Sequence, residues 1–159
     1  MNSRVLVAIA LAAVAFATAV HPEEEEWSTE TAGDISLFMV MQSYRINADY
    51  CSEEVPALKP GFDEFMKSLS GRIRGIGKDL LDSDAFKGMQ QLPVPSALLG
   101  VLAAKLEETR SELEDLDAGE ICPQTLQHYR SMTDEALRDF LRRTLAGIQS
   151  TIRTLQKPR

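Results

Sequence analysis

The sequence predicts an all-α protein: an antiparallel bundle of four to five helices with one disulfide, preceded by a cleaved signal peptide and an acidic flexible arm. Apolar residues recur at intervals of three and four along most of the chain, the spacing of one helix face. Alternating strand patterns joined by Asn-Gly or Asp-Gly turns do not occur. An even number of cysteines behind an export signal predicts the disulfide.

Residues 1–19 have the three parts of a secretory signal peptide. Arg4 gives a positive start, residues 5–16 are unbroken apolar, and Ala17-Thr18-Ala19 is a small-residue cleavage site. The apolar run is shorter than the roughly 20 residues that span a bilayer. We therefore expect residues 1–19 to be removed on export, with no transmembrane segment in the mature chain. The Ala-rich run favours a periplasmic or secreted protein of a Gram-negative bacterium.

Residues 20–33 are predicted to form a disordered acidic arm. They are polar, and their few apolar residues do not recur at a helical or strand interval. Residues 34–157 are then expected to form a single helical domain. The formal net charge of −7 argues against a nucleic-acid partner.

The first helix is expected from Asp34, as its N-cap, to Glu54, where Pro56 disfavours helical geometry at the preceding residue. Its apolar residues fall on two opposite faces, which is typical of a helix buried between others. One face carries Ile35, Phe38, Met39, Ile46 and Tyr50, and the other carries Leu37, Val40, Met41, Tyr44, Ala48 and Cys51.

The second helix is expected to begin near Pro60, and it has one apolar stripe. The stripe consists of Phe62, Phe65, Met66, Leu69, Ile73, Ile76 and Leu80. Gly71 and Gly75 lie away from it and would permit a bend or a close neighbour.

A third helix is expected from Ser96 to Leu116, with Gly119 as its C-terminal stop. Its inward residues are expected to be Leu99, Leu102, Leu106 and Leu113. The last helical region is expected to open with Pro123 in its first turn, and Thr133 is expected to cap a long final helix. The apolar stripe of that helix is Leu137, Leu141, Leu145, Ile148, Ile152 and Leu155.

Cys51 and Cys122 allow one pairing, and we predict that they form the disulfide. The alternative is a reactive thiol. Cys51 falls at a helix C-terminus, where the helix dipole disfavours a thiolate. Cys122 is better placed to be a reactive thiol. However, the six-residue spacing from Cys122 to His128 does not put the two side chains on one helical face.

No cofactor or metal is predicted. The chain contains no C-x-x-C or H-x-x-x-H spacing. Met39 and Met41 project to opposite sides of a helix and would not share one ion. The stretch GRIRGIGK at 71–78 lacks the spacing of a phosphate-binding loop, and DLDAGE at 115–120 lacks that of a calcium loop.

Acidic and basic residues are segregated along the chain. Seven acids fall between residues 107 and 120, and the bases gather toward the end of the chain. We expect the acidic third helix and the basic last helix to face each other, with a surface that orients a partner as the alternative. The candidate partner-facing basic residues are Arg72, Arg74, Lys78, Arg138 and Arg142.

The leading functional hypothesis is a non-enzymatic protein-interaction module that binds an unidentified protein partner. The alternative is a carrier of a small apolar ligand, with Phe38, Met39, Met41 and Tyr44 lining a cavity in the bundle core. A second alternative is a small carboxylate-dependent hydrolase, for which spacing alone selects no pair of acids.

Overall fold

The computed structural model describes residues 27–156, so the predicted signal peptide, the arm up to residue 26 and residues 157–159 lie outside the described part. Its elements are α2 (Ala32–Glu54), η1 (Pro56–Leu58), α3 (Lys59–Leu81), η2 (Lys87–Gln90), α4 (Ser96–Glu114), α5 (Ala118–Ser131) and α6 (Asp134–Leu155). Within residues 27–156 there is no β-strand, only an isolated bridge between Thr31 and Pro93. The all-α prediction is confirmed.

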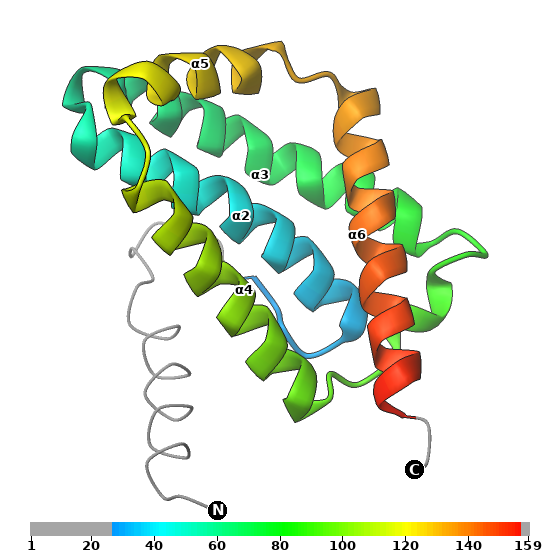
Figure 1. Cartoon of the computed structure of the whole chain (residues 1–159). Helices are drawn as coiled ribbons and strands as arrows, with labels where there is room; N and C mark the ends of the chain where they lie inside the picture. Colours follow the sequence, from blue (N-terminus) through cyan, green and yellow to red (C-terminus); the bar gives the residue numbers. More distant parts are fainter. Residues whose placement is uncertain (1–26, 157–159) are drawn as a thin grey trace, which may run out of the picture.

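Helix α2 lies at the centre of the bundle and contacts α3, α4, α5 and α6 (Figure 1). α2 and α3 run in opposite directions, as predicted for an antiparallel bundle. α3 and α5, however, run side by side in the same direction, and α6 crosses the ends of the others (Figure 1). Antiparallel packing therefore describes the α2–α3 pair and not every neighbouring pair.

The start of α2 differs from the prediction. Thr31, not Asp34, is the N-cap: its hydroxyl accepts a hydrogen bond of 3.1 Å from the backbone N–H of Asp34. The Asp34 carboxylate in turn accepts from the Thr31 hydroxyl at 2.9 Å. This reciprocal bonding places the N-cap three residues earlier than the sequence suggested.

The last residues of the predicted arm have a defined course. The guanidinium carbon of Arg74 lies 4.4 Å from the centre of the Trp27 ring, and the backbone N–H of Ala32 donates to the carbonyl of Leu92 at 2.8 Å. Ala32 and Gly33 are buried in the first turn of α2. Helix α2 therefore begins before residue 34.

Helices α2 and α3 approach closely at Gly77. A Cβ atom added there would lie 2.6 Å from Cδ2 of Leu37, a distance that real structures do not tolerate. The two glycines to which the sequence assigned this role, Gly71 and Gly75, have no neighbour within 4 Å of such an atom. The close contact therefore depends on Gly77, which the stripe pattern did not single out.

Aromatic rings fill the space between α2, α3, α5 and α6. The Tyr129 ring stacks on Phe65 with 4.6 Å between centroids, and the Tyr44 ring meets the edge of Tyr129 at 5.1 Å. Phe62 and Phe140 complete the cluster at 6.1 and 5.9 Å from Tyr129 and Tyr44, respectively. Such ring pairs stabilise the core beyond the burial of apolar area, and they favour particular orientations of the rings.

Helix α6 follows its prediction closely. The Thr133 hydroxyl caps it by accepting from the backbone N–H of Ala136, and its stripe is buried from Leu137 to Ile152. Leu155, the last predicted member of the stripe, is exposed.

The region from α4 to α5 differs most from the prediction. Leu98 and Leu113 are the buried residues of α4, whereas Leu99 is exposed. Gly119 does not stop α4: it lies in the first turn of α5, whose N-cap Asp117 accepts from the Gly119 N–H at 2.9 Å. Pro123 consequently lies inside α5 rather than in its first turn. Asp117 offers an earlier cap than Pro123, so the helix begins upstream.

Candidate interaction surface

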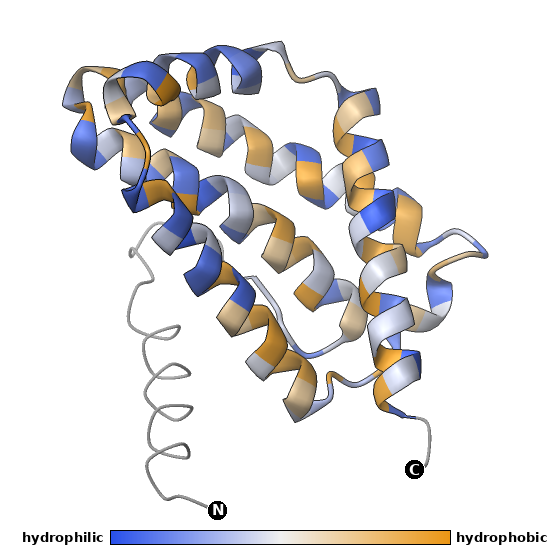
Figure 2. Ribbon diagram, viewed as in Figure 1, coloured by the Kyte–Doolittle hydropathy of each residue, from blue (hydrophilic) through white to orange (hydrophobic). Residues whose placement is uncertain are grey.

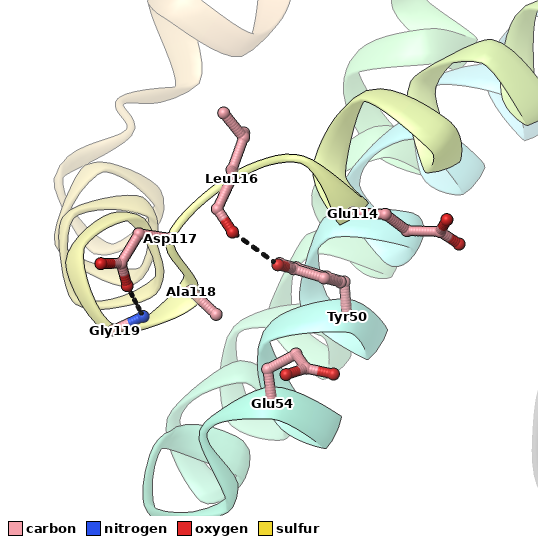
Figure 3. Close-up of a pocket in the computed structure, with 7 residues that line it drawn as sticks. All are labelled: Tyr50, Glu54, Glu114, Leu116, Asp117, Ala118 and Gly119. Carbon is pink, nitrogen blue, oxygen red and sulfur yellow. Dashed lines mark hydrogen bonds between the residues drawn. The ribbon is translucent and has the colours of Figure 1, made fainter.

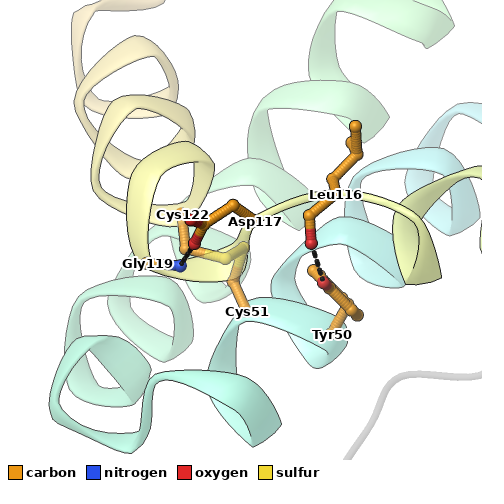
Figure 4. The surroundings of a disulfide bond; sticks show 6 residues. All are labelled: Tyr50, Cys51, Leu116, Asp117, Gly119 and Cys122. Atoms are coloured by element: carbon orange, nitrogen blue, oxygen red, sulfur yellow. Dashed lines mark hydrogen bonds between the residues drawn. A yellow bond between two sulfur atoms is a disulfide. The ribbon is translucent and has the colours of Figure 1, made fainter.

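The disulfide joins the end of α2 to the second turn of α5 (Figure 4). Cys51 and Cys122 are both buried, their sulfur atoms are 2.05 Å apart and their Cα atoms 5.4 Å apart. The predicted pairing is confirmed. The link fixes the corner at which the end of α2 meets the turn between α4 and α5.

A surface depression of about 530 Å³ lies beside this corner (Figure 3). Its lining comes from the end of α2, the end of α4 and the start of α5: Tyr50, Glu54, Glu114, Leu116, Asp117, Ala118 and Gly119. The Tyr50 hydroxyl donates to the carbonyl of Leu116 at 3.2 Å and so holds the turn against α2. Carboxylates and Leu116 therefore line one depression, and Figure 3 shows the Leu116 carbonyl facing Tyr50 with its side chain directed away.

The charge in this depression is negative. Partial burial raises the pKa of Tyr50 above its usual value, and the charges of Glu54, Asp117 and Glu114 raise it further. The partial negative charge at the C-terminal end of α4 has the same sign. A cation is the species that this field attracts.

The acidic segment from Lys105 to Glu120 holds seven acids and two bases. Both bases are engaged within α4: Lys105 contacts Glu108 at 2.7 Å and Arg110 contacts Glu107 at 3.4 Å. These pairs are local to α4, so they do not bear out the expectation that α4 and α6 neutralise each other across an interface. The segment keeps a surplus of negative charge.

The five candidate partner-facing basic residues all contact groups of this chain. Arg72 donates to Asp134 at 2.7 Å and to the carbonyl of Met132 at 2.8 Å, which ties α3 to the start of α6. The remaining contacts are Arg138 with Asp79, Lys78 with Asp82, Arg142 with Asp139, and Arg74 with the Trp27 ring. Their first role in the structure is therefore to pair with this chain's own acids and ring.

The four residues expected to line a ligand cavity are packed into the bundle. Met39 and Met41 are buried, and Phe38 and Tyr44 are half-buried. Tyr44 belongs to the aromatic cluster, and its hydroxyl lies 3.4 Å from the sulfur of Met132. Neither the depression beside the disulfide nor a second one, which Trp27, Ser28, Thr29 and Glu30 line, includes any of the four.

An apolar surface on the N-terminal half of α4 was not anticipated. Leu99 and Val101 are 45% and 55% exposed, and Leu116, after the end of α4, is 47% exposed. Ala97, Gly100 and Ala104 are exposed as well. Figure 2 shows the hydropathy of α4 changing from apolar at its start to hydrophilic at its end. The signal in the sequence is the unbroken run ALLGVLAA at 97–104, which is too wide to be covered on every side of a helix.

Two further observations apply to residues 27–156. No three His, Cys, Asp or Glu side chains among them are grouped so as to hold a metal ion. None of their helices has the length and apolar character needed to cross a membrane. His128, which the sequence placed near Cys122, is exposed on the last turn of α5.

Comparison with known proteins gives no relative on which to base an assignment. No protein-family model, no curated protein and no solved structure matches this chain.

Proposed function

We propose that this chain is an exported protein-interaction module whose single disulfide fixes the surface that meets the partner. The observation that carries the proposal is the exposed apolar surface of α4. Three large apolar side chains, Leu99, Val101 and Leu116, lie exposed on one helix and the turn that follows it. Adjoining exposed apolar residues, such as Val101 with Ala97, Gly100 and Ala104, are typical of protein–protein contact sites.

Packing in the bundle favours a binding surface over an internal ligand site. Tyr44, one of the residues expected to face a ligand, instead contacts the rings of Phe65, Tyr129 and Phe140. Met41 is almost fully buried in the core cluster. These side chains are covered by protein neighbours, whereas Leu99 and Val101 of α4 are about half exposed within residues 27–156.

Export is part of the proposal. The signal-peptide features of residues 1–19 support it, and so does a disulfide between buried cysteines, because such bonds form and persist in oxidising compartments. A periplasmic or secreted location would also explain why the tie between α2 and α5 is covalent.

The test is a capture experiment under oxidising conditions. The disulfide-bonded chain, immobilised through its C-terminus, should recover the same protein repeatedly from an extract of the envelope of the cells that export it. An immobilised Val101→Glu variant should recover less, because a carboxylate would be placed in the apolar surface. An Ala146→Glu variant, altered at an exposed position of α6, is the matched control and should behave as the unmodified chain.

Absence of a reproducible partner would contradict the proposal. Native mass spectrometry provides a separate check on the carrier alternative. A lipid or other apolar molecule that remains bound to the purified chain would favour that alternative.

A further inference from the structure

The outer side of α4 has two halves of different chemistry. At 100° per residue, nine of its exposed residues share an arc of about 140°. We call them the α4 strip; its apolar half is Ala97, Gly100, Val101 and Ala104, and its acidic half is Glu107, Glu108, Glu112 and Asp115, with Ser111 among them. The order along one helix face is therefore apolar and then acidic.

The apolar half is shaped for contact with another helix. Three of its four residues are alanine or glycine, and Val101 projects beside them. Small side chains let a second helix approach closely, and a larger one fills a groove between ridges. Leu99 lies two residues before Val101 and about 160° from it around the helix, so its exposed side chain is outside this half.

The acidic half leads into the depression beside the disulfide. Glu114, near the end of α4, lines that depression together with Glu54 and Asp117 (Figure 3). Leu116 lies in the same depression. A lysine or arginine suits such surroundings, because its charge meets the carboxylates of Glu54 and Glu114. The C-terminal end of α4 also favours a positive charge.

We propose that the α4 strip and the adjoining depression dock a cationic amphipathic helix of a protein partner. The helix would place apolar residues at three- and four-residue intervals on the apolar half, and lysine or arginine beside Glu112 and Asp115 and in the depression, since Glu107 and Glu108 already pair with Arg110 and Lys105. This inference rests on the proposed interaction function and adds to it the site and the chemistry of the partner.

A second copy of this chain fits the strip less well. Two strips packed in the same direction would set acidic half on acidic half. Two strips packed in opposite directions would set each acidic half on an apolar half. Neither arrangement supplies the positive charge that the acidic half would meet in a complementary interface.

Two synthetic helices test the inference. Both have about 18 residues, close to the 19-residue length of α4. Both carry leucine and alanine along one half, and the other half carries lysine in one peptide and glutamate in the other. Fluorescence anisotropy with the disulfide-bonded chain should detect binding of the lysine peptide and not of the glutamate peptide. Raising the ionic strength should weaken the binding.

Substitutions then locate the site. Val101→Glu should weaken binding of the lysine peptide about tenfold, because a buried apolar contact is lost. Asp115→Lys should weaken it by several-fold and reduce the salt dependence. The matched controls are Ala146→Glu on α6 and Glu64→Lys on α3, both at exposed positions, and they should leave binding unchanged. Circular dichroism on each variant confirms that the helices remain.

Each of three outcomes would overturn the inference. The two peptides could bind equally, the lysine peptide could fail to bind, or the strip and control substitutions could have equal effects. The capture experiment separates this outcome from failure of the proposed function. A partner that the Val101→Glu and Asp115→Lys variants still recover in full would leave the interaction function standing and place its site elsewhere.

Discussion

Helices α4 and α6 are both long and rich in leucine, yet they bury these residues to different extents. α6 buries five side chains in one continuous stripe, whereas α4 buries only Leu98 and Leu113. The apolar residues of α6 recur at intervals of three and four with charged residues between them, so only one face can turn inward. The first turns of α4 are apolar on every side, so some of that surface stays exposed wherever the helix packs.

The polar contacts of the two helices differ in the same way. α6 is joined to α3 by Arg72 with Asp134 and by Arg138 with Asp79. The ion pairs of Lys105 and Arg110 stay within α4. α6 is thus part of the framework, and α4 is a helix that presents a surface.

The largest expected effect comes from removing the disulfide beside the end of α4. Replacing Cys51 and Cys122 together by serine should lower the free energy of unfolding by about 4 kcal/mol, because the bond closes a long loop, with a sequence separation of 71. Urea unfolding gives the free energy. Hydrogen exchange should show α4 and α5 losing more protection than α6.

If the double substitution lowers the free energy of unfolding by less than about 1 kcal/mol, packing alone holds the end of α2 against α5. The reduced, unsubstituted chain is the matched control, and it should behave as the double variant does.

A pair of leucine truncations tests the comparison directly. Leu141→Ala in α6 should cost about 3 kcal/mol of unfolding free energy, because Leu141 is fully buried and a cavity remains. Leu99→Ala in α4 removes the same atoms from an exposed site and should cost less than about 0.5 kcal/mol. Thermal or urea unfolding measures both.

Similar losses for the two variants would contradict the difference between the helices. They would imply that the exposed side of α4 is covered in the isolated chain, for example by self-association, which the protein-concentration dependence of unfolding would reveal.

The smallest expected effect concerns the ion pairs. Arg72→Met should lower the free energy of unfolding by about 1 kcal/mol, because the half-buried guanidinium loses a carboxylate and a backbone carbonyl. Lys105→Met should change it little, since exposed pairs within one helix contribute only a few tenths of a kcal/mol. Added salt should reduce the first difference only in part, because the bond to the carbonyl of Met132 remains. Equal effects would argue that Arg72 does not hold α6 in place.

Much of the fold could be predicted from local patterns. The stripes of α3 and α6, the cap at Thr133 and the end of α2 before Pro56 each depend on a few neighbouring residues, and each appears in the structure. The pairing of Cys51 with Cys122 could be predicted without knowing the geometry, because two cysteines allow only one intramolecular bond.

The errors fell where two local signals competed. Thr31 and Asp34 are both good caps, and the structure uses Thr31 as cap and Asp34 as its partner in the first turn. Asp117 and Pro123 both mark the start of a helix, and the earlier one begins α5. Gly119 is a frequent helix stop but here serves the first turn of the next helix. Sequence alone ranks such signals poorly because their free energies are similar.

The sequence by itself determined that the chain is helical, which residues form the stripes of α3 and α6, and which cysteines pair, because spacing and composition alone decide these features. Only the tertiary structure decided that Gly77 admits Leu37, that Arg72 ties α3 to α6, and that Leu99 and Val101 face outward. A helix that is apolar on every side does not specify which of its faces its neighbours will cover. That choice depends on where α2 and α6 leave room, and it leaves the α4 strip exposed.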